Sequence, residues 1–143
     1  MAFKELQPSE IYFSQRTIAS CFRKESRYAK KLIGETLDDL VVGRCRIEDF
    51  PKISVVKKNG VWVSADNRRL WILRQLEALG LCERTKVKVR KSLGPGKYVI
   101  EEEVQIRGNP GGVIYTNISQ IVHECLEELL GGLSQLHLNA NQT

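Results

Sequence analysis

The centre of the sequence constrains the fold more than any other region. Two short apolar runs, residues 53–56 and 61–63, flank the dipeptide Asn59-Gly60. An Asn-Gly pair between apolar runs is a strong signal for a tight β-hairpin turn. Residues 64–67, Ser-Ala-Asp-Asn, then supply candidate N-cap side chains for a helix over residues 68–79. A hairpin that leads directly into a helix predicts a fold that mixes α and β structure.

Periodicity adds further elements on both sides of this centre. We expect short strands over residues 11–13, 86–90, 98–100 and 104–106, and helices over residues 17–23, 26–41 and 118–130. Gly43 is suited to end the helix over 26–41 in a left-handed conformation. The expected fold class is α+β, a small mixed sheet with helices packed on it. We expect one domain over residues 1–134 and a flexible tail over 135–143.

Positive charge is concentrated in the first three quarters of the chain. All 22 Lys and Arg residues lie at or before Arg107, together with 14 acidic residues, for a net charge of +8 there. The rest contains three glutamates and no Lys or Arg, for −3. This asymmetry favours an anionic partner such as a nucleotide or nucleic acid, although basic surfaces also serve solubility alone.

Targeting and metal-binding patterns are missing from the sequence. No apolar run approaches the length of a membrane-spanning helix, and charged residues interrupt the first thirty positions. We therefore expect an intracellular protein, cytoplasmic or nuclear, with no membrane partner. The four cysteines form no CxxC pair, so we expect reduced thiols and no metal site.

The predicted helix start at Asp66-Asn67-Arg68-Arg69 is the sharpest candidate for chemistry. A helix N-terminus leaves backbone N–H groups without partners and carries a partial positive charge, which suits a phosphate. Arg68 and Arg69 would add bidentate donors to the same anion. In the alternative interpretation, Asp66 and Asn67 only cap the helix, and the arginines pair with carboxylates of the chain.

The hairpin, this turn, the helix after it and the step Leu79-Gly80-Leu81 resemble the ParB/sulfiredoxin superfamily over residues 9–91. The resemblance implies nucleotide binding at the turn, with Arg69 at the superfamily's most characteristic arginine. It places Ser64, Asp66, Asn67, Arg68 and Arg69 against the phosphates. It also implies that residues of the preceding helix complete the pocket, and these are Lys30, Lys31 and Thr36.

Two departures from that superfamily narrow the expected function. Asn67 stands where sulfiredoxins carry their reactive cysteine, so we do not expect sulfinic acid reduction. No helix-turn-helix pattern follows Arg90, so operator recognition of the ParB kind is not expected. What the resemblance still implies is a nucleoside triphosphate with Mg²⁺ and a phosphotransferase, NTPase or nuclease reaction. Asp66 would then be the catalytic residue, as metal ligand or general base.

Two functions without catalysis remain open. The first is nucleic-acid binding by a basic stretch without any acidic residue between its cations. The stretch is formed by Arg84, Lys86, Lys88, Arg90 and Lys91. Arg23, Lys24, Lys30 and Lys31 would extend it into a groove. The second is an adaptor whose acidic helix over 118–130 docks a protein partner, with the nucleotide site vestigial.

Overall fold

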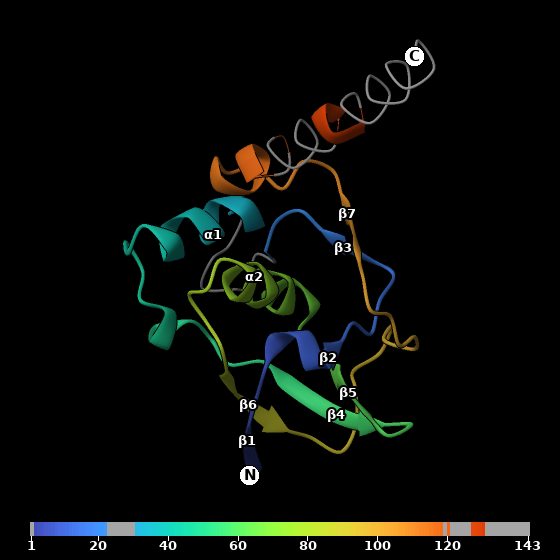
Figure 1. Cartoon of the computed structure of the whole chain (residues 1–143). Coiled ribbons are helices and arrows are strands. Elements are labelled where there is room, and N and C mark those ends of the chain that lie inside the picture. Colours follow the sequence, from blue (N-terminus) through green and yellow to red (C-terminus); the bar gives the residue numbers. More distant parts are fainter. Residues whose placement is uncertain (1, 23–30, 119, 121–126, 131–143) are drawn as a thin grey trace, which may run out of the picture.

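The protein has an α+β fold, seen in a computed structural model that describes residues 2–22, 31–118, 120 and 127–130 (Figure 1). Its strands are β1 (Ala2–Leu6), β2 (Ile11–Tyr12), β3 (Thr17–Ala19), β4 (Ser54–Lys58), β5 (Val61–Ser64), β6 (Thr85–Val89) and β7 (Gln105–Arg107). Its helices are α1 (Ile33–Val41) and α2 (Asn67–Ala78), with short 3-10 helices η1 (Pro8–Glu10) and η2 (Ile47–Asp49). The sheet forms the lower layer in Figure 1, and α2 lies between this sheet and α1. The ParB/sulfiredoxin-like arrangement within this class stays a prediction.

Five strands form a mixed sheet in the order β1-β6-β4-β5-β2. β1 pairs antiparallel with β6, and β4 pairs antiparallel with β5. The β4–β6 and β5–β2 pairs are parallel. A second, two-stranded sheet pairs β3 with β7 in parallel.

The central hairpin and helix form as the sequence predicts. Asn59 and Gly60 both have positive φ angles, 52° and 81°, which a tight hairpin turn between twisted strands requires. Gly80, with φ of 77°, follows the end of α2, and Gly43, with φ of 82°, follows α1. These signals are local, so they could be predicted without knowledge of the tertiary fold.

α2 is the centre of the hydrophobic core. Its buried side chains, Leu70, Trp71, Ile72, Leu73 and Leu76, do not fall on one stripe. A helix that is buried on more than one side lies inside a domain rather than on its surface. Val55 and Val87 of the sheet pack on this core from one side, and Leu37 of α1 from the other.

Residues 110–114 are held tightly against α1. Gly34 donates its N–H to the carbonyl of Pro110 at 2.8 Å. A Cβ at Gly34 would lie 2.0 Å from the carbonyl oxygen of Gly111, so only glycine allows this approach. The carboxylate of Asp38 accepts the N–H groups of Val113 and Ile114 at 2.7 and 3.0 Å. Asp38 therefore caps the helical turn over 114–118 from a neighbouring helix.

The prediction of a helix over residues 17–23 is wrong. Thr17–Ala19 form strand β3, with Ile18 opposite Ile106 of β7, and Ile18 is buried at 2% exposure. Cys21 continues the extended chain through an antiparallel bridge to Leu32. The strand partners lie far away in the sequence, so local periodicity could not reveal them.

Other boundaries differ by smaller amounts. Residues 31 and 32 are extended, so α1 is shorter than the helix expected over 26–41, of which residues 26–30 lie outside the described part. Residues 98–100 form no strand, and β7 is shifted one residue beyond 104–106. Helical structure begins at Ile114 rather than 118 and is also described at 120 and over 127–130. The expected tail, 135–143, lies outside the described residues.

Candidate functional site

The turn between β5 and α2 is built from side chains that bond to the chain itself. Asn67 is 4% exposed; its Oδ1 accepts the N–H of Ser14 at 2.9 Å, and its Nδ2 donates to the Oγ of Ser14 at 3.0 Å. Ser14 in turn donates to the carbonyl of Ser64 at 2.6 Å. The Oγ of Ser64, fully buried, accepts the N–H of Asp66 at 2.9 Å. Ser64 and Asn67 thus fasten the end of β2 to the start of α2.

The two adjacent arginines also reach backbone carbonyls within the protein. Arg68 donates to the carbonyl of Cys21 at 2.7 Å, and its guanidinium lies 5.9 Å from the ring centroid of Phe22. Arg69 donates to the carbonyl of Lys52 at 3.3 Å and lies 4.0 Å from Oδ1 of Asp66. These contacts give both arginines a role in holding loops onto α2. Phosphate binding by this turn stays a prediction.

Two of the residues expected to complete a nucleotide pocket, Lys31 and Thr36, contact their own segment. The ammonium of Lys31 pairs with the carboxylate of Asp39 on α1. Thr36 is buried at 1% exposure, and its Oγ1 lies 3.4 Å from the carbonyl of Leu32. Lys30 lies outside the described residues. A nucleotide pocket completed by these residues stays a prediction.

One oxygen of the Asp66 carboxylate is engaged within the protein, and Mg²⁺ binding at this turn stays a prediction. Oδ2 of Asp66 accepts the N–H of Ser54 at 2.7 Å, which turns one of its oxygens into the sheet. Within residues 2–22, 31–118, 120 and 127–130, no three or more His, Cys, Asp or Glu side chains group closely enough to hold a metal ion. No catalytic step through a metal at Asp66 is therefore derived.

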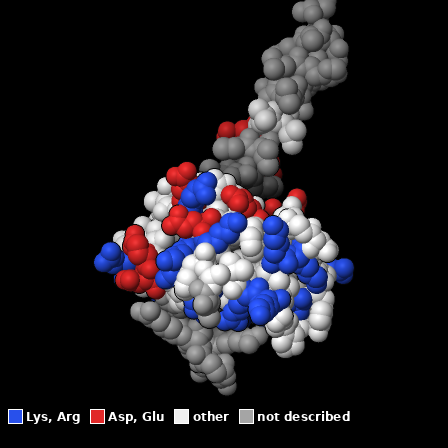
Figure 2. All heavy atoms as spheres, turned by 90° about the horizontal axis from the view of Figure 1, so that it is seen from below, with Lys and Arg blue, Asp and Glu red and all other residues white. Residues whose placement is uncertain are grey.

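A different set of cations stays at the surface, on the strands of the five-stranded sheet. Lys86 and Lys88 alternate with Val87, which is fully buried, so both lysines point away from α2. Lys57 and Lys58 end β4, and Lys4 lies on the edge strand β1. We call the basic sheet surface the set formed by Lys4, Lys57, Lys58, Lys86, Lys88, Arg90 and Lys91. Figure 2 shows the underside of the molecule, where Lys and Arg side chains spread over the right and lower parts and acidic ones gather on the left and upper side.

No member of the basic sheet surface forms an ion pair with a described residue. The ion pairs in the described part engage other cations: Arg16, Lys31, Arg44, Arg46 and Arg69. Six of the seven side chains are exposed, and Lys88 is half-buried. Glu5 of β1 lies opposite Lys86 in the strand pair without forming an ion pair with it, so most of the positive charge of these strands faces solvent.

Two aromatic rings each lie beside lysines, but on opposite faces of the sheet. Trp62 lies opposite Lys57, on the face of the buried Val55, whereas Phe3 lies opposite Lys88, on the face away from α2. The half-buried ring of Trp62 on β5 has the ammonium of Lys4 at 5.0 Å and that of Lys57 at 5.6 Å from its centroid. Phe3 is 48% exposed and has the ammonium of Lys86 at 5.0 Å. Lysine ammonium groups at such distances are attracted to ring faces.

Sequence reasoning found only part of this surface. It included Lys86, Lys88, Arg90 and Lys91 because they follow one another in the chain. It missed Lys4, Lys57 and Lys58, which join them only through the pairing of β1 and β4 with β6. The positions of Lys57 and Lys58 beside the Asn-Gly turn were the available signal. Arg84 precedes β6 and lines a surface hollow together with Lys86 of this surface and with Ile47 and Phe50.

Two groups in the described part have shifted pKa values. Burial lowers the pKa of Arg74 despite nearby Glu103, Glu77 and Glu102, and this guanidinium donates to the carbonyls of Ile11 and Glu102. Burial, followed by the charge of Glu77, raises the pKa of Cys82. A raised pKa keeps the Cys82 thiol protonated, so Cys82 is a poor nucleophile.

Comparisons with known proteins give this chain no relatives: no family model, no curated protein and no solved structure matches it. The described helices include none with the length and apolar character needed to cross a membrane. The function must therefore be argued from the site alone.

Proposed function

We propose that this protein binds nucleic acid through the basic sheet surface, without catalysis. The observation that carries the proposal is a set of seven cations on β1, β4 and the end of β6 that make no ion pair with described residues. Cations that are not neutralised within the protein gain most from a polyanion, since each phosphate contact releases condensed counterions. Such contact agrees with the cytoplasmic or nuclear location expected from the sequence.

The aromatic rings favour a single strand over a duplex. Phe3 lies beside Lys86 on the face away from α2, and Trp62 lies beside Lys4 and Lys57 on the other face. A strand whose phosphates meet the ammonium groups of either face would bring its bases near the ring of that face. Base stacking on aromatic side chains contributes about 1–3 kcal/mol per base and needs bases that are free of a partner strand. The surface is thus suited to sequence-tolerant binding of single-stranded DNA or RNA.

Fluorescence anisotropy with a labelled single strand tests the proposal. With about four phosphate contacts, we expect the affinity to fall roughly 50-fold between about 50 and 200 mM salt. The triple variant Lys57→Gln, Lys86→Gln, Lys88→Gln should lose most of the binding and its salt dependence. The double variant Arg44→Gln, Arg46→Gln is the matched control, because both arginines already pair with acidic side chains. Equal losses in both variants, or no binding at low salt, would refute the proposal.

A second candidate function is nucleotide binding at the turn before α2. The hydrogen bond from the Ser54 N–H to Oδ2 of Asp66 supports it, because this bond partly offsets the repulsion between the carboxylate and a phosphate at the turn. Thermal-shift measurements with ATP, CTP and GTP, with and without Mg²⁺, test this function. We expect a nucleotide-dependent rise in melting temperature that Arg69→Ala removes. A catalytic role of Asp66 and an adaptor role of residues 118–130 remain predictions.

A further inference from the structure

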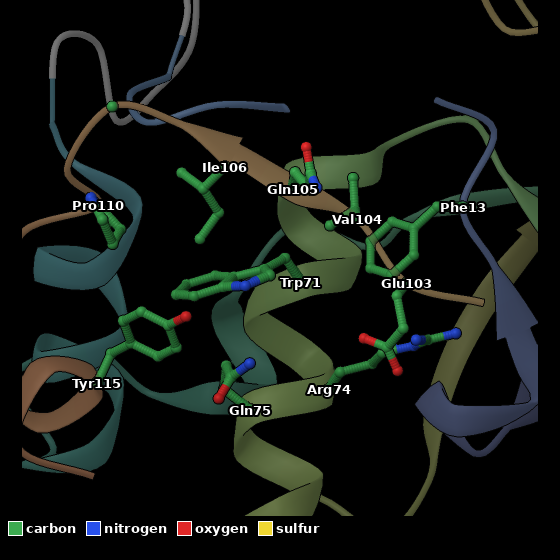
Figure 3. Close-up of a pocket in the computed structure, with 11 residues that line it drawn as sticks. Phe13, Trp71, Arg74, Gln75, Glu103, Val104, Gln105, Ile106, Pro110 and Tyr115 are labelled. Atoms are coloured by element: carbon green, nitrogen blue, oxygen red, sulfur yellow. The ribbon is translucent and has the colours of Figure 1, made fainter. Parts of the chain in front are cut away.

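A cavity of about 540 Å³ lies between α2, β7 and residues 108–115, apart from the basic sheet surface (Figure 3). Its walls combine apolar and aromatic side chains, from Phe13, Trp71, Val104, Ile106, Pro110 and Tyr115, with the polar side chains of Arg74, Gln75, Glu103 and Gln105. Trp71 and Tyr115 meet edge to face, with ring centroids 5.0 Å apart and an interplanar angle of 70°. The volume falls within the range of small-molecule sites, and flat rings line it.

Three polar side chains at this cavity make no hydrogen bond with a described residue: the indole N–H of Trp71 and the amides of Gln75 and Gln105. Trp71 is only 5% exposed. Because every buried side-chain N or O atom in the described part has a partner, the indole N–H must reach solvent through the cavity. In Figure 3 the indole ring lies between Gln105 above and Gln75 below. An indole N–H that reaches solvent at the cavity is free to donate to an acceptor on a ligand.

The charges at the cavity disfavour an anionic ligand. Arg74 directs its guanidinium to the backbone carbonyls of Pro8, Ile11 and Glu102, and it lies 4.6 Å from the ring centroid of Phe13. Its donors are thus engaged within the protein. Glu103 lines the same cavity with its negative charge. A phosphate would meet this carboxylate without a free cation to balance it.

We propose that this cavity binds a neutral, planar heteroaromatic ring with an amide-type edge, the chemical class of nucleobases and nicotinamide. The ring would pack against Trp71 and Tyr115. Its carbonyl or ring nitrogen would accept from the indole N–H, and its donors and acceptors would pair with Gln75 and Gln105. A pure hydrocarbon would offer no acceptor to the indole N–H of Trp71 and no partner to the half-buried amide of Gln75. The site is independent of the proposed nucleic-acid surface.

The indole N–H signal of Trp71 in a nitrogen–proton NMR spectrum tests this site directly. The chain contains two tryptophans, so the Trp62→Phe variant leaves Trp71 as the single indole signal. Adenosine, cytidine, uridine, guanosine and nicotinamide are titrated as neutral ligands, and AMP as the anionic counterpart of adenosine. We expect at least one neutral ring to shift the signal saturably, and AMP to bind more weakly than adenosine.

Matched variants separate the cavity from unspecific ring binding. Gln75→Leu and Gln105→Leu, each in the Trp62→Phe background, should weaken binding about tenfold or more. Gln7→Leu is the control, because Gln7 lies outside this cavity and its side chain makes no cap bond. Circular dichroism verifies that each variant is folded. No saturable shift by any of the five neutral rings, an equal effect of Gln7→Leu, or tighter binding of AMP than adenosine would overturn the proposal.

Discussion

The arginines of α2 and the lysines of the five-stranded sheet carry the same charge but have different surroundings. Arg68, Arg69 and Arg74 all donate to backbone carbonyls of other segments. Lys57, Lys86 and Lys88 make no ion pair with a described residue. The arginines therefore hold loops onto the central helix, while the lysines remain available to a partner. Net charge counts both groups equally and cannot tell them apart.

Side-chain chemistry explains why the two sets divide in this way. The guanidinium presents several N–H donors in a planar fork, so one arginine can serve carbonyls from separate segments, as Arg74 does with Pro8, Ile11 and Glu102. A lysine on a strand carries its charge out from the sheet on a flexible stem and stays hydrated. We therefore expect substitution of the lysines to weaken nucleic-acid binding without loss of stability, and substitution of the arginines to lower stability without loss of binding.

The largest expected effect comes from reversing charge on the sheet. The triple variant Lys57→Glu, Lys86→Glu, Lys88→Glu should bind a single strand about 10²-fold more weakly or worse at roughly 0.1 M salt, because three phosphate contacts become repulsive. Its urea midpoint should stay close to that of the parent, since none of the three lysines is buried or forms an ion pair with a described residue. Anisotropy and urea denaturation are measured on the same preparation. Unchanged binding by the folded variant, or a large drop in its urea midpoint, would contradict the comparison.

Removing the guanidinium of Arg74 should give the largest loss of stability. Arg74→Met keeps the aliphatic packing but leaves the carbonyls of Ile11 and Glu102 without this donor, at a cost of about 2–4 kcal/mol in free energy of unfolding. Nucleic-acid affinity of the folded variant should not change. The control is Arg44→Met, an exposed ion pair with Asp39, for which we expect a loss under about 1 kcal/mol. Urea denaturation distinguishes these outcomes.

The neighbouring arginines at the start of α2 should differ by a smaller amount. Arg68→Met removes the short bond to Cys21 and the contact with Phe22, so we expect a loss of about 1–2 kcal/mol. Arg69→Met removes a longer bond from a more exposed side chain and should cost under about 1 kcal/mol. Chemical denaturation of both variants measures the difference. A larger loss at Arg69 would mean that the 3.3 Å bond to Lys52 understates its structural role.

Elements that depend on neighbouring residues could be predicted from the sequence. The hairpin followed from Asn59-Gly60, and α2 from its apolar residues and Gly80. Strand β3 could not be predicted, because Ile18 is stabilised in an extended conformation by Ile106, far along the chain. The basic surface was predicted only where its members follow one another on β6, since Lys4 and Lys57 join them through strand pairing.

The α2 turn shows the same limit for side chains. The sequence could place Asp66, Arg68 and Arg69 at the start of a helix, because capping residues and helix periodicity are local properties. It could not say that Ser54, Cys21 and Lys52 would lie within hydrogen-bond reach of them. Those partners come from other segments, so the tertiary fold determines which charged side chains form hydrogen bonds within the protein.

The amino-acid sequence by itself determined the class of fold, the central hairpin and helix, and the excess of positive charge. Tertiary structure alone decided where that charge is available, and it formed the cavity at Trp71 from residues of α2, β7 and the segment after it. The physical reason is the range of the forces involved. Turn geometry and helix periodicity act between neighbours in the chain, whereas burial, hydrogen bonding to distant carbonyls and charge compensation depend on which segments fold together.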